Sequence, residues 1–302
     1  MRWTKKGLII EPTGQFDWMV THASIPFAER IQGDLYRVYF YGRDRLNRSQ
    51  PGYIEIDINE PKKILYITEK PVLELGSLGA FDDSGVMPSC IVDREGLKYL
   101  FYTGWTQGVT VPFYFYVGLA ASHDGGRHFE RISRGPILER NNCDPYLTAS
   151  PYILIENGVW RMWYCSSMRW GIEDGELVPY DQIKYAESKD GINWKREGVA
   201  CIDRGCKLAR PCVLKEEGIY KMWYSAYKSE TYRIGYAESG DGIHWESKDN
   251  VVGIDVSESG WDSEMIEYAF VFEHNGRKFM LYNGNDYGRT GLGYAIMDVK
   301  EK

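Results

Sequence analysis

The sequence predicts an all-β fold, a five-bladed β-propeller with four antiparallel strands in each blade. Three observations predict it: a repeat of about sixty residues throughout the chain, a strand–turn–strand pattern within each copy, and an N-terminal strand of the type that the last copy lacks. One such repeat is too small to bury its apolar face alone, so neighbouring copies must pack together. We therefore expect residues 1–302 to form a single domain.

The most regular element of the repeat is a strand that ends on a tyrosine. These residues are Tyr41, Tyr102, Tyr164, Tyr224 and Tyr282, separated by 61, 62, 60 and 58 positions. Four strands of about five or six residues, with their turns, account for this period. Because Trp163-Tyr164 recurs as Trp223-Tyr224, these aromatic residues are explained by blade packing, and much of the 15% aromatic content is architectural.

Each tyrosine strand has a strand on either side. The upstream strand is apolar and usually opens on proline, as at Pro151 and Pro211, which suits the first residue of a strand. The downstream strand ends at a serine, and after one further residue comes Asp-Gly, at 124–125, 190–191 and 241–242. Asp-Gly favours a tight turn because glycine adopts positive φ without strain, so we assign these turns a structural role.

The last repeat stops after its third strand, near Asp298. The strand expected near the N-terminus has Trp3 at its start, and the fourth strands of two other repeats likewise start with Trp194 and Trp245. We predict that residues 2–10 complete blade five. This would close the ring and leave only short, protected strand edges.

Composition excludes several classes of protein. With 36 Lys and Arg against 43 Asp and Glu, the net charge of −7 argues against a nucleic-acid-binding surface. No apolar run approaches the roughly 20 residues of a membrane span, and the N-terminal apolar run is short for a signal peptide. The six cysteines have no C-x-x-C or zinc spacing, which favours buried thiols in a cytoplasmic protein.

The connections that lead into the inner strands carry ionisable residues, which differ from blade to blade. They are Asp17 and His22; Asp82 and Asp83; Asp144; Asp203 and Arg210; and Asp262, Glu264 and Glu267. Asp17 lies nine residues before its proline and Asp144 seven, so we do not expect a strictly repeated structural cap. The variation predicts a differentiated site in a central funnel.

The Met-Trp-Tyr strands and Ser-x-Asp-Gly-x-x-Trp hairpins resemble the five-bladed propeller glycosidase superfamily. It includes invertase-like, arabinanase and β-xylosidase-like, and β-mannoside phosphorylase families. The resemblance implies that Asp17, in Phe-Asp-Trp-Met, is the base or nucleophile, and that Asp144, in Cys-Asp-Pro, orients the site. It also implies a glutamic acid as proton donor, but blade four has Arg210-Pro211 there. The acid would then be Glu267, Glu264 or Asp83.

Other residues are candidates for binding. Arg210 suits a carboxylate or phosphate, or else neutralises a neighbouring Asp. His22 is the one histidine near an inner strand, where a structural role is the more common one. Aromatic residues outside the repeat are candidate sugar platforms: Trp18, Trp105, Tyr146, Trp170 and Tyr268, with Trp170 in a long connection (166–182) that can form a rim. No cofactor is predicted, although a carboxylate-lined channel can hold Ca²⁺.

These patterns predict a carbohydrate-active enzyme that cleaves or transfers a glycosidic bond in the funnel. Such chemistry needs one carboxylic acid to protonate the leaving oxygen and one carboxylate at the anomeric carbon, directly or through water. Two alternatives stay open. One is a non-catalytic glycan-binding propeller, suggested by the missing glutamate of blade four. The other is a phosphorylase or transferase for an anionic or phosphorylated sugar, suggested by Arg210.

Overall fold

The computed structural model describes residues 1–173, 175–228 and 231–298, and the regular secondary structure of this part of the chain is almost entirely β-strand. The chain divides into two compact units. Unit 1 contains residues 1–71, 212–242 and 246–302, and unit 2 contains residues 72–211 and 243–245. The all-β fold class predicted from the sequence is confirmed.

Unit 1 holds three groups of paired strands. The first is β2 (Thr21–Gln32), β3 (Leu35–Arg43), β4 (Ser49–Asp57) and β5 (Ile64–Ile67). The second is β14 (Leu208–Glu216, which begins in unit 2), β15 (Ile219–Lys228), β16 (Thr231–Ser239) and β17 (Glu246–Ser247), followed by the short 3-10 helix η1 (Asp249–Val251). The third is β18 (Glu267–His274), β19 (Arg277–Asn283), β20 (Leu292–Met297) and β1 (Trp3–Ile10), with the turn α1 (Asn285–Gly288) between β19 and β20.

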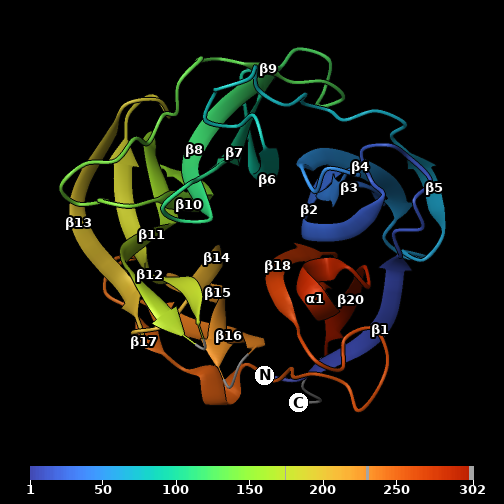
Figure 1. Cartoon of the computed structure of the whole chain (residues 1–302). Helices are drawn as coiled ribbons and strands as arrows, with labels where there is room; N and C mark the ends of the chain where they lie inside the picture. The colour runs from blue at the N-terminus through green and yellow to red at the C-terminus, as the bar shows by residue number, and fades with distance from the viewer. Residues whose placement is uncertain (174, 229–230, 299–302) are drawn as a thin grey trace. The chain divides into compact units, whose positions relative to one another are not determined.

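The N-terminal strand belongs to the last of these sheets. β1 pairs antiparallel with β20, from Trp3 opposite Met297 to Ile10 opposite Leu292 (Figure 1). Residues from the two ends of the chain therefore share one sheet. Closure of a ring by this strand stays a prediction.

Unit 2 holds two groups of antiparallel strands. One is β6 (Gly85–Arg94), β7 (Leu97–Gln107), β8 (Phe113–Ser122) and β9 (Glu130–Arg131). The other is β10 (Thr148–Glu156), β11 (Val159–Glu173), β12 (Glu176–Ser188) and β13 (Trp194–Asp203). The tyrosine of each repeat lies on the second strand of its group and is buried, as are Trp163 and Trp223. These rings build the core, as predicted.

The first strand of several groups contains a bulge with a non-glycine residue at positive φ. Tyr268 (φ 56°), Ser150 (φ 51°) and Ile25 (φ 54°) occupy this position. The backbone N–H of Tyr268 donates to Ser225 Oγ (2.8 Å), and that of Ser150 donates to Thr103 Oγ1 (2.8 Å). The acceptor is in each case the residue after a repeat tyrosine. The bulge thus links neighbouring groups of strands within each unit and redirects the adjacent side chains.

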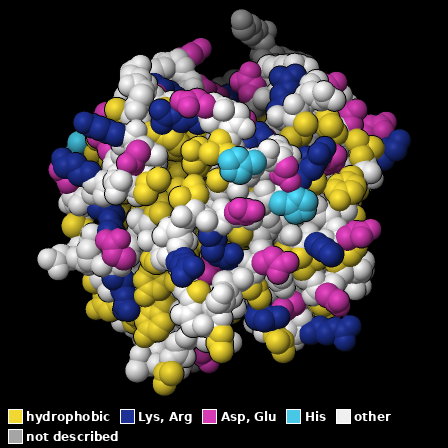
Figure 2. Space-filling view, turned by 90° about the horizontal axis from the view of Figure 1, so that it is seen from above, with side chains coloured by type: hydrophobic (Ala, Val, Ile, Leu, Met, Phe, Trp, Pro, Cys, Tyr) yellow, Lys and Arg dark blue, Asp and Glu magenta, His cyan; other side chains and the backbone are white. Residues whose placement is uncertain are grey.

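The predicted Asp-Gly turns are present and make local hydrogen bonds. Asp190, for example, accepts hydrogen bonds from the backbone N–H groups of Ile192 and Asn193 (2.9 and 2.8 Å). Cys143 and Cys165 carry free thiols. No helix in the described part of the chain is long and apolar enough to cross a membrane. Acidic and basic side chains are interspersed on the face seen in Figure 2.

Candidate functional site

The most unusual ionisable group in unit 1 is Glu267, the first residue of β18. Its side chain is fully buried, and Asn283 Nδ2, from the facing strand β19, donates a hydrogen bond to its Oε1 (3.0 Å). The other oxygen, Oε2, has no hydrogen-bond partner among the residues that the structure describes. Burial raises the pKa of Glu267 to about 8, so the carboxyl is largely protonated at neutral pH. A neutral carboxylic acid of this kind suits general acid catalysis.

Aromatic and charged groups surround this acid. Tyr268 follows it directly, and its ring centroid lies 6.4 Å from that of Tyr232, which in turn lies 6.1 Å from that of Tyr287. Burial and the neighbouring Glu267 raise the pKa of Tyr287 to about 12. Arg43, at the end of β3, acts in the other direction, because its positive charge favours the ionised form of Glu267.

His22 belongs to the same cluster. It is buried near the start of β2, and its Nδ1 lies 2.9 Å from Thr21 Oγ1. Burial, reinforced by the positive charge of Arg43, lowers the pKa of His22 to about 4, while Asp286 opposes this shift. His22 is therefore a neutral imidazole at pH 7, able to donate and accept hydrogen bonds but not to act as a cation.

Four residues of this cluster have left-handed backbone conformations. His22 (φ 63°), Tyr268 (φ 56°), Asp286 (φ 49°) and Tyr287 (φ 57°) are all non-glycine residues. Each such conformation costs on the order of 1–3 kcal/mol, and such residues concentrate at functional sites, where the surrounding structure holds them. The sequence offered no signal for Asp286 or Tyr287, which lie outside every repeated motif.

Asp144 has a different environment. Its side chain is fully buried in unit 2, where it accepts hydrogen bonds from the Tyr164 hydroxyl (3.0 and 3.2 Å) and contacts Lys184 Nζ (3.3 Å) and Arg196 Nη1 (3.0 Å). Both carboxylate oxygens thus have partners within the fold. This environment favours a structural contribution.

The same arrangement recurs in other groups of strands. Tyr102 donates to Asp82, which pairs with Arg131; Tyr282 donates to Asp262, which pairs with Lys5. Our expectation that no structural device repeats among these acids is wrong for Asp82, Asp144 and Asp262. Each of these aspartates lies 20 residues before the tyrosine that donates to it. The cation that pairs with each aspartate lies two residues after an aromatic residue, which is Phe129 for Asp82, Trp194 for Asp144 and Trp3 for Asp262. That spacing was readable in the sequence.

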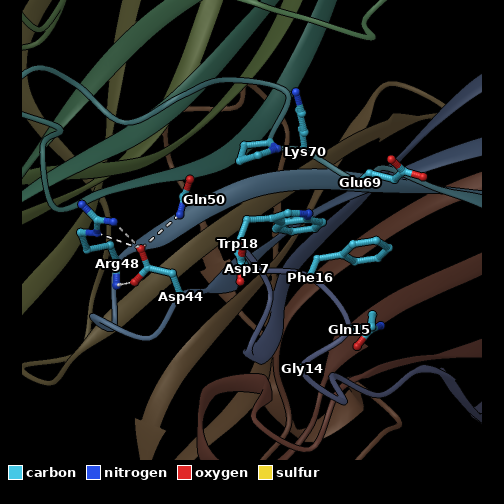
Figure 3. Close-up of a pocket in the computed structure, with 11 residues that line it drawn as sticks. Gly14, Gln15, Phe16, Asp17, Trp18, Asp44, Arg48, Gln50, Glu69 and Lys70 are labelled. Carbon is cyan, nitrogen blue, oxygen red and sulfur yellow. Dashed lines mark hydrogen bonds and ion pairs between the residues drawn. The ribbon is translucent and has the colours of Figure 1, made fainter.

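Asp17 lies elsewhere in unit 1. It is exposed and lines a pocket of about 580 Å³ whose walls come from residues 14–18, 44–50 and 69–71 (Figure 3). Neither Glu267 nor His22 lines this pocket. Trp18 is only 3% exposed and donates from Nε1 to the Thr68 carbonyl (3.3 Å), so its ring offers little open surface to a sugar.

The two other acid candidates, Glu264 and Asp83, lie in different environments. Glu264 is exposed, and its backbone N–H donates to Asn285 Oδ1 (2.8 Å). Partial burial acts to raise the pKa of Asp83, but hydrogen bonds from Gly79, Thr106 and Ser84 outweigh it and lower that pKa. An acid that loses its proton so readily is a poor donor near neutral pH.

The remaining candidates are in unit 2. Arg210 is 1% exposed, has φ 52°, and donates from Nη1 to the Pro88 carbonyl (3.3 Å). Tyr146 is exposed, and the half-buried Trp170 ring lies 5.4 Å from that of Phe113. Within the described residues, no group of His, Cys, Asp or Glu side chains is arranged to hold a metal ion.

The sequence did not indicate one buried acidic residue of unit 2, Asp181. Asp181 on β12 is buried and accepts a hydrogen bond from Ser167 Oγ. Burial raises the pKa of Asp181 to about 7. No motif marks it, because its burial depends on the packing of the 204–208 connection, where the Cys206 carbonyl accepts its backbone N–H.

Solved structures define the class of fold. The chain superposes on a glycoside hydrolase with a TM-score of 0.74 and 18% identity, over 99% of this chain and 92% of that protein. A thermostable family-43 glycoside hydrolase matches with a TM-score of 0.67 and 19% identity, over 91% of this chain and 88% of that protein. An endo-arabinase from Bacteroides thetaiotaomicron VPI-5482 matches with a TM-score of 0.62 and 15% identity, over 98% of this chain and 99% of that protein. The resemblance to the propeller glycosidase superfamily is thus confirmed at the level of fold.

Sequence comparison identifies a nearer group. No protein-family model matches the chain. It is 42% identical over 302 residues to the uncharacterized proteins MT1551 and Rv1502 of Mycobacterium tuberculosis (strains CDC 1551 / Oshkosh and ATCC 25618 / H37Rv), covering 99% of this chain and 100% of each relative. The chain belongs to the family of these mycobacterial proteins. A 1,2-beta-oligomannan phosphorylase of Thermoanaerobacter sp. (strain X514) is 26% identical over 168 residues, covering 51% of this chain and 52% of that enzyme.

Proposed function

We propose that this protein is a carbohydrate-active enzyme that cleaves or transfers a glycosidic bond, with Glu267 as the proton donor. The observation that carries the proposal is the fully buried, protonated Glu267 carboxyl with one unpartnered oxygen. The glycoside hydrolase fold supports it, because that fold is shared with proteins named for this chemistry.

The groups around Glu267 fit this role. Burial keeps the proton on the acid until a leaving oxygen needs it, and the Asn283 amide fixes the position of the carboxyl. The rings of Tyr268 and Tyr287 offer apolar faces with hydroxyl groups, which suit the mixed surface of a sugar. His22, as a neutral imidazole, can hydrogen-bond a sugar hydroxyl.

A second carboxylate must act at the anomeric carbon. The superfamily resemblance assigns this part to Asp17, which is exposed in its pocket. For Asp144 we propose a positioning role, because Tyr164, Lys184 and Arg196 occupy its oxygens. Arg210, Tyr146 and Trp170 remain proposals for substrate contacts.

We further propose that the five groups of strands are the five blades of one propeller domain. Three groups lie in unit 1 and two in unit 2, and each follows the sequence repeat. The pairing of β1 with β20 supports ring closure, since it joins the two ends of the chain in one sheet.

A phosphorylase is the second candidate function. Arg43 interacts electrostatically with Glu267, and both Arg43 and Arg289 interact with His22, so one guanidinium group acts on the acid and two act on the neighbouring histidine. Guanidinium groups suit phosphate recognition. The 26% identity to a phosphorylase over half of the chain favours the same possibility.

The test is turnover by the wild-type protein and by Glu267→Gln. A panel of 4-nitrophenyl glycosides and β-linked mannose, arabinose and xylose oligosaccharides is assayed with and without inorganic phosphate. We expect Glu267→Gln to lose about 100-fold or more of the activity, the usual contribution of a general acid. Glu273→Gln, an exposed residue of the same strand, is the matched control and should keep full activity.

Phosphate dependence separates the two enzyme classes, since a phosphorylase releases a sugar phosphate and a hydrolase does not need phosphate. Saccharide binding by calorimetry without any product would overturn the enzyme proposal in favour of a glycan-binding protein. Full activity in Glu267→Gln would remove Glu267 from the mechanism.

A further inference from the structure

The segment 284–291, which contains the turn α1, departs from the repeat. In three other groups the second strand continues well past its repeat tyrosine, since β7 reaches Gln107, β11 reaches Glu173 and β15 reaches Lys228, whereas β3 ends at Arg43. β19 instead ends at Asn283, directly after Tyr282. The described connection from β7 to β8 closes through a hydrogen bond from Gly108 N to the Pro112 carbonyl (3.1 Å), without a helical turn.

The turn is held firmly. Asn285 N donates to the Trp261 carbonyl (2.9 Å), and Thr290 Oγ1 donates to the same carbonyl (2.6 Å). Asn285 Oδ1 accepts the backbone N–H groups of Glu264 (2.8 Å) and Met265 (3.1 Å). These contacts fix the segment on both sides of Asp286 and Tyr287, the two consecutive residues with left-handed φ.

The turn packs against the residues that hold Glu267. A Cβ at Gly288 would lie 2.6 Å from the Ala23 carbonyl and 3.1 Å from Asn283 Cβ, so the turn is in close contact with β2 and with the partner of the acid. The Tyr287 ring contacts Tyr232, which in turn contacts Tyr268. The turn thus places the Tyr287 ring against the aromatic residues beside Glu267.

Asp286 carries the charge of this turn. Its side chain is 56% exposed, and it forms a long ion pair with Arg289 (3.5 Å). It interacts electrostatically with Glu267, His22 and Arg43. The Glu267 carboxyl is therefore buried, whereas the Asp286 carboxyl is exposed to solvent. Different environments of this kind allow one carboxyl group to act as an acid and the other as a base.

We propose that Asp286 is the second carboxylate of the site and acts as the general base on a water molecule. This inference rests on the proposed function and reassigns to Asp286 the part that the resemblance gives to Asp17. Glu267 gives its proton to the leaving oxygen as the glycosidic C–O bond breaks. Water forms the new C–O bond and gives its proton to Asp286, and exchange with solvent restores both carboxyl groups.

The position of Asp286 explains the choice of base over nucleophile. A half-exposed carboxylate has room for a water molecule between itself and a bound sugar, which a directly attacking carboxylate does not require. The proposal therefore includes inversion at the anomeric carbon. Asp17 lies among residues 14–18, 44–50 and 69–71, and no residue of the Glu267 cluster lines that pocket.

The experiment compares Asp286→Asn with Asp17→Asn. Asp93→Asn is the matched control, because Asp93 is 54% exposed and also forms one surface ion pair, with Lys98 (3.0 Å). Turnover is measured on the glycoside that the wild-type protein cleaves best, and binding of the intact glycoside is measured by calorimetry. We expect Asp286→Asn to lose about 100-fold or more in kcat with the glycoside still bound, while the control Asp93→Asn stays within a few-fold of wild type. Asp17→Asn tests the competing assignment of the base.

A second measurement does not depend on activity. The carboxyl carbons of glutamate are labelled with ¹³C, Glu267 is assigned with Glu267→Gln, and its titration is followed by NMR in each variant. Removing the negative charge of Asp286 should lower the pKa of Glu267, whereas Asp17→Asn should leave it unchanged. An unchanged titration in Asp286→Asn overturns the proposal.

The outcomes separate the two levels of inference. Loss of turnover in Asp17→Asn with full turnover in Asp286→Asn, or retention at the anomeric carbon, overturns the role of Asp286 and leaves the proposed function intact. Absence of turnover in the wild-type protein overturns both the proposed function and the role of Asp286 as a base. The titration then reports only whether the two carboxyl groups face each other.

Discussion

Glu267→Gln should make the protein more stable at alkaline pH, although it removes the proposed catalytic acid. In the unfolded chain a glutamic acid ionises near pH 4.5, whereas burial raises the pKa of Glu267 in the folded protein to about 8. The folded state therefore holds a proton that the unfolded state has lost. The contribution of Glu267 to stability is therefore fully present below pH 4.5 and is lost as the pH rises towards 8.

The magnitude follows from the two pKa values. A rise from 4.5 to about 8, at about 1.4 kcal/mol for each pKa unit, corresponds to at most about 5 kcal/mol. Glutamine carries no such penalty and keeps the oxygen that accepts the hydrogen bond of Asn283. The difference in unfolding free energy between Glu267→Gln and wild type should thus grow by up to about 5 kcal/mol from pH 4.5 to 8.

The assay is urea unfolding of both proteins at several pH values from 4.5 to 8.5. His22 contributes a slope of opposite sign, because its lowered pKa of about 4 makes stability rise with pH up to about 6.5. That contribution is present in both proteins and cancels in the difference. A difference that stays flat over this range, or that falls with pH, would refute the reasoning that Glu267 is protonated by burial. Glu273→Gln, at an exposed residue of the same strand, is the control.

Other variants test other features of the structure. Burial raises the pKa of Asp181 to about 7, so this residue should lower the stability of the wild-type protein as the pH rises from about 4 to 7. Asp181→Asn should lack this decrease, and urea unfolding of both proteins at the two pH values measures it. Tyr164→Phe should cost about 1–3 kcal/mol in thermal unfolding, because the buried Asp144 carboxylate loses a donor; an unchanged Tm would contradict the structural role of that pair. Gly288→Ala should destabilise the protein and lower turnover more than Gly276→Ala. Both glycines have positive φ, but at Gly288 the new Cβ would meet a backbone carbonyl at 2.6 Å, and at Gly276 it meets open space.

The strands were predictable because they repeat. Five tyrosines at a nearly constant spacing, with Asp-Gly turns after the following strand, mark the same local structure several times, so an error in one copy is corrected by the others. Trp3 identified the N-terminal strand for the same reason. Periodicity thus indicates strand order and much of the core.

The site was only partly predictable, because its chemistry depends on burial. Glu267 and His22 were named from their positions near inner strands, but their protonation follows from packing that no motif records. Asp144 matched a family motif, yet its oxygens are occupied by partners from three strands. Asp286 stands on a turn that interrupts the repeat, and a prediction that depends on repetition passes over such a segment.

The amide of Asn283 decides where the proton of Glu267 resides. Its Oδ1 accepts the backbone N–H of Ile25 (3.3 Å), and a backbone nitrogen can only donate, so the Asn283 amide group cannot be turned around. Its Nδ2 must then face Glu267 Oε1, which accepts this hydrogen bond, and the carbonyl oxygen of a protonated carboxyl is the better acceptor of the two oxygens. The hydroxyl is left on Oε2, the oxygen with no partner in the described structure. The contact that ties β2 to β19 therefore also orients the acid so that its transferable hydrogen is on the unoccupied oxygen.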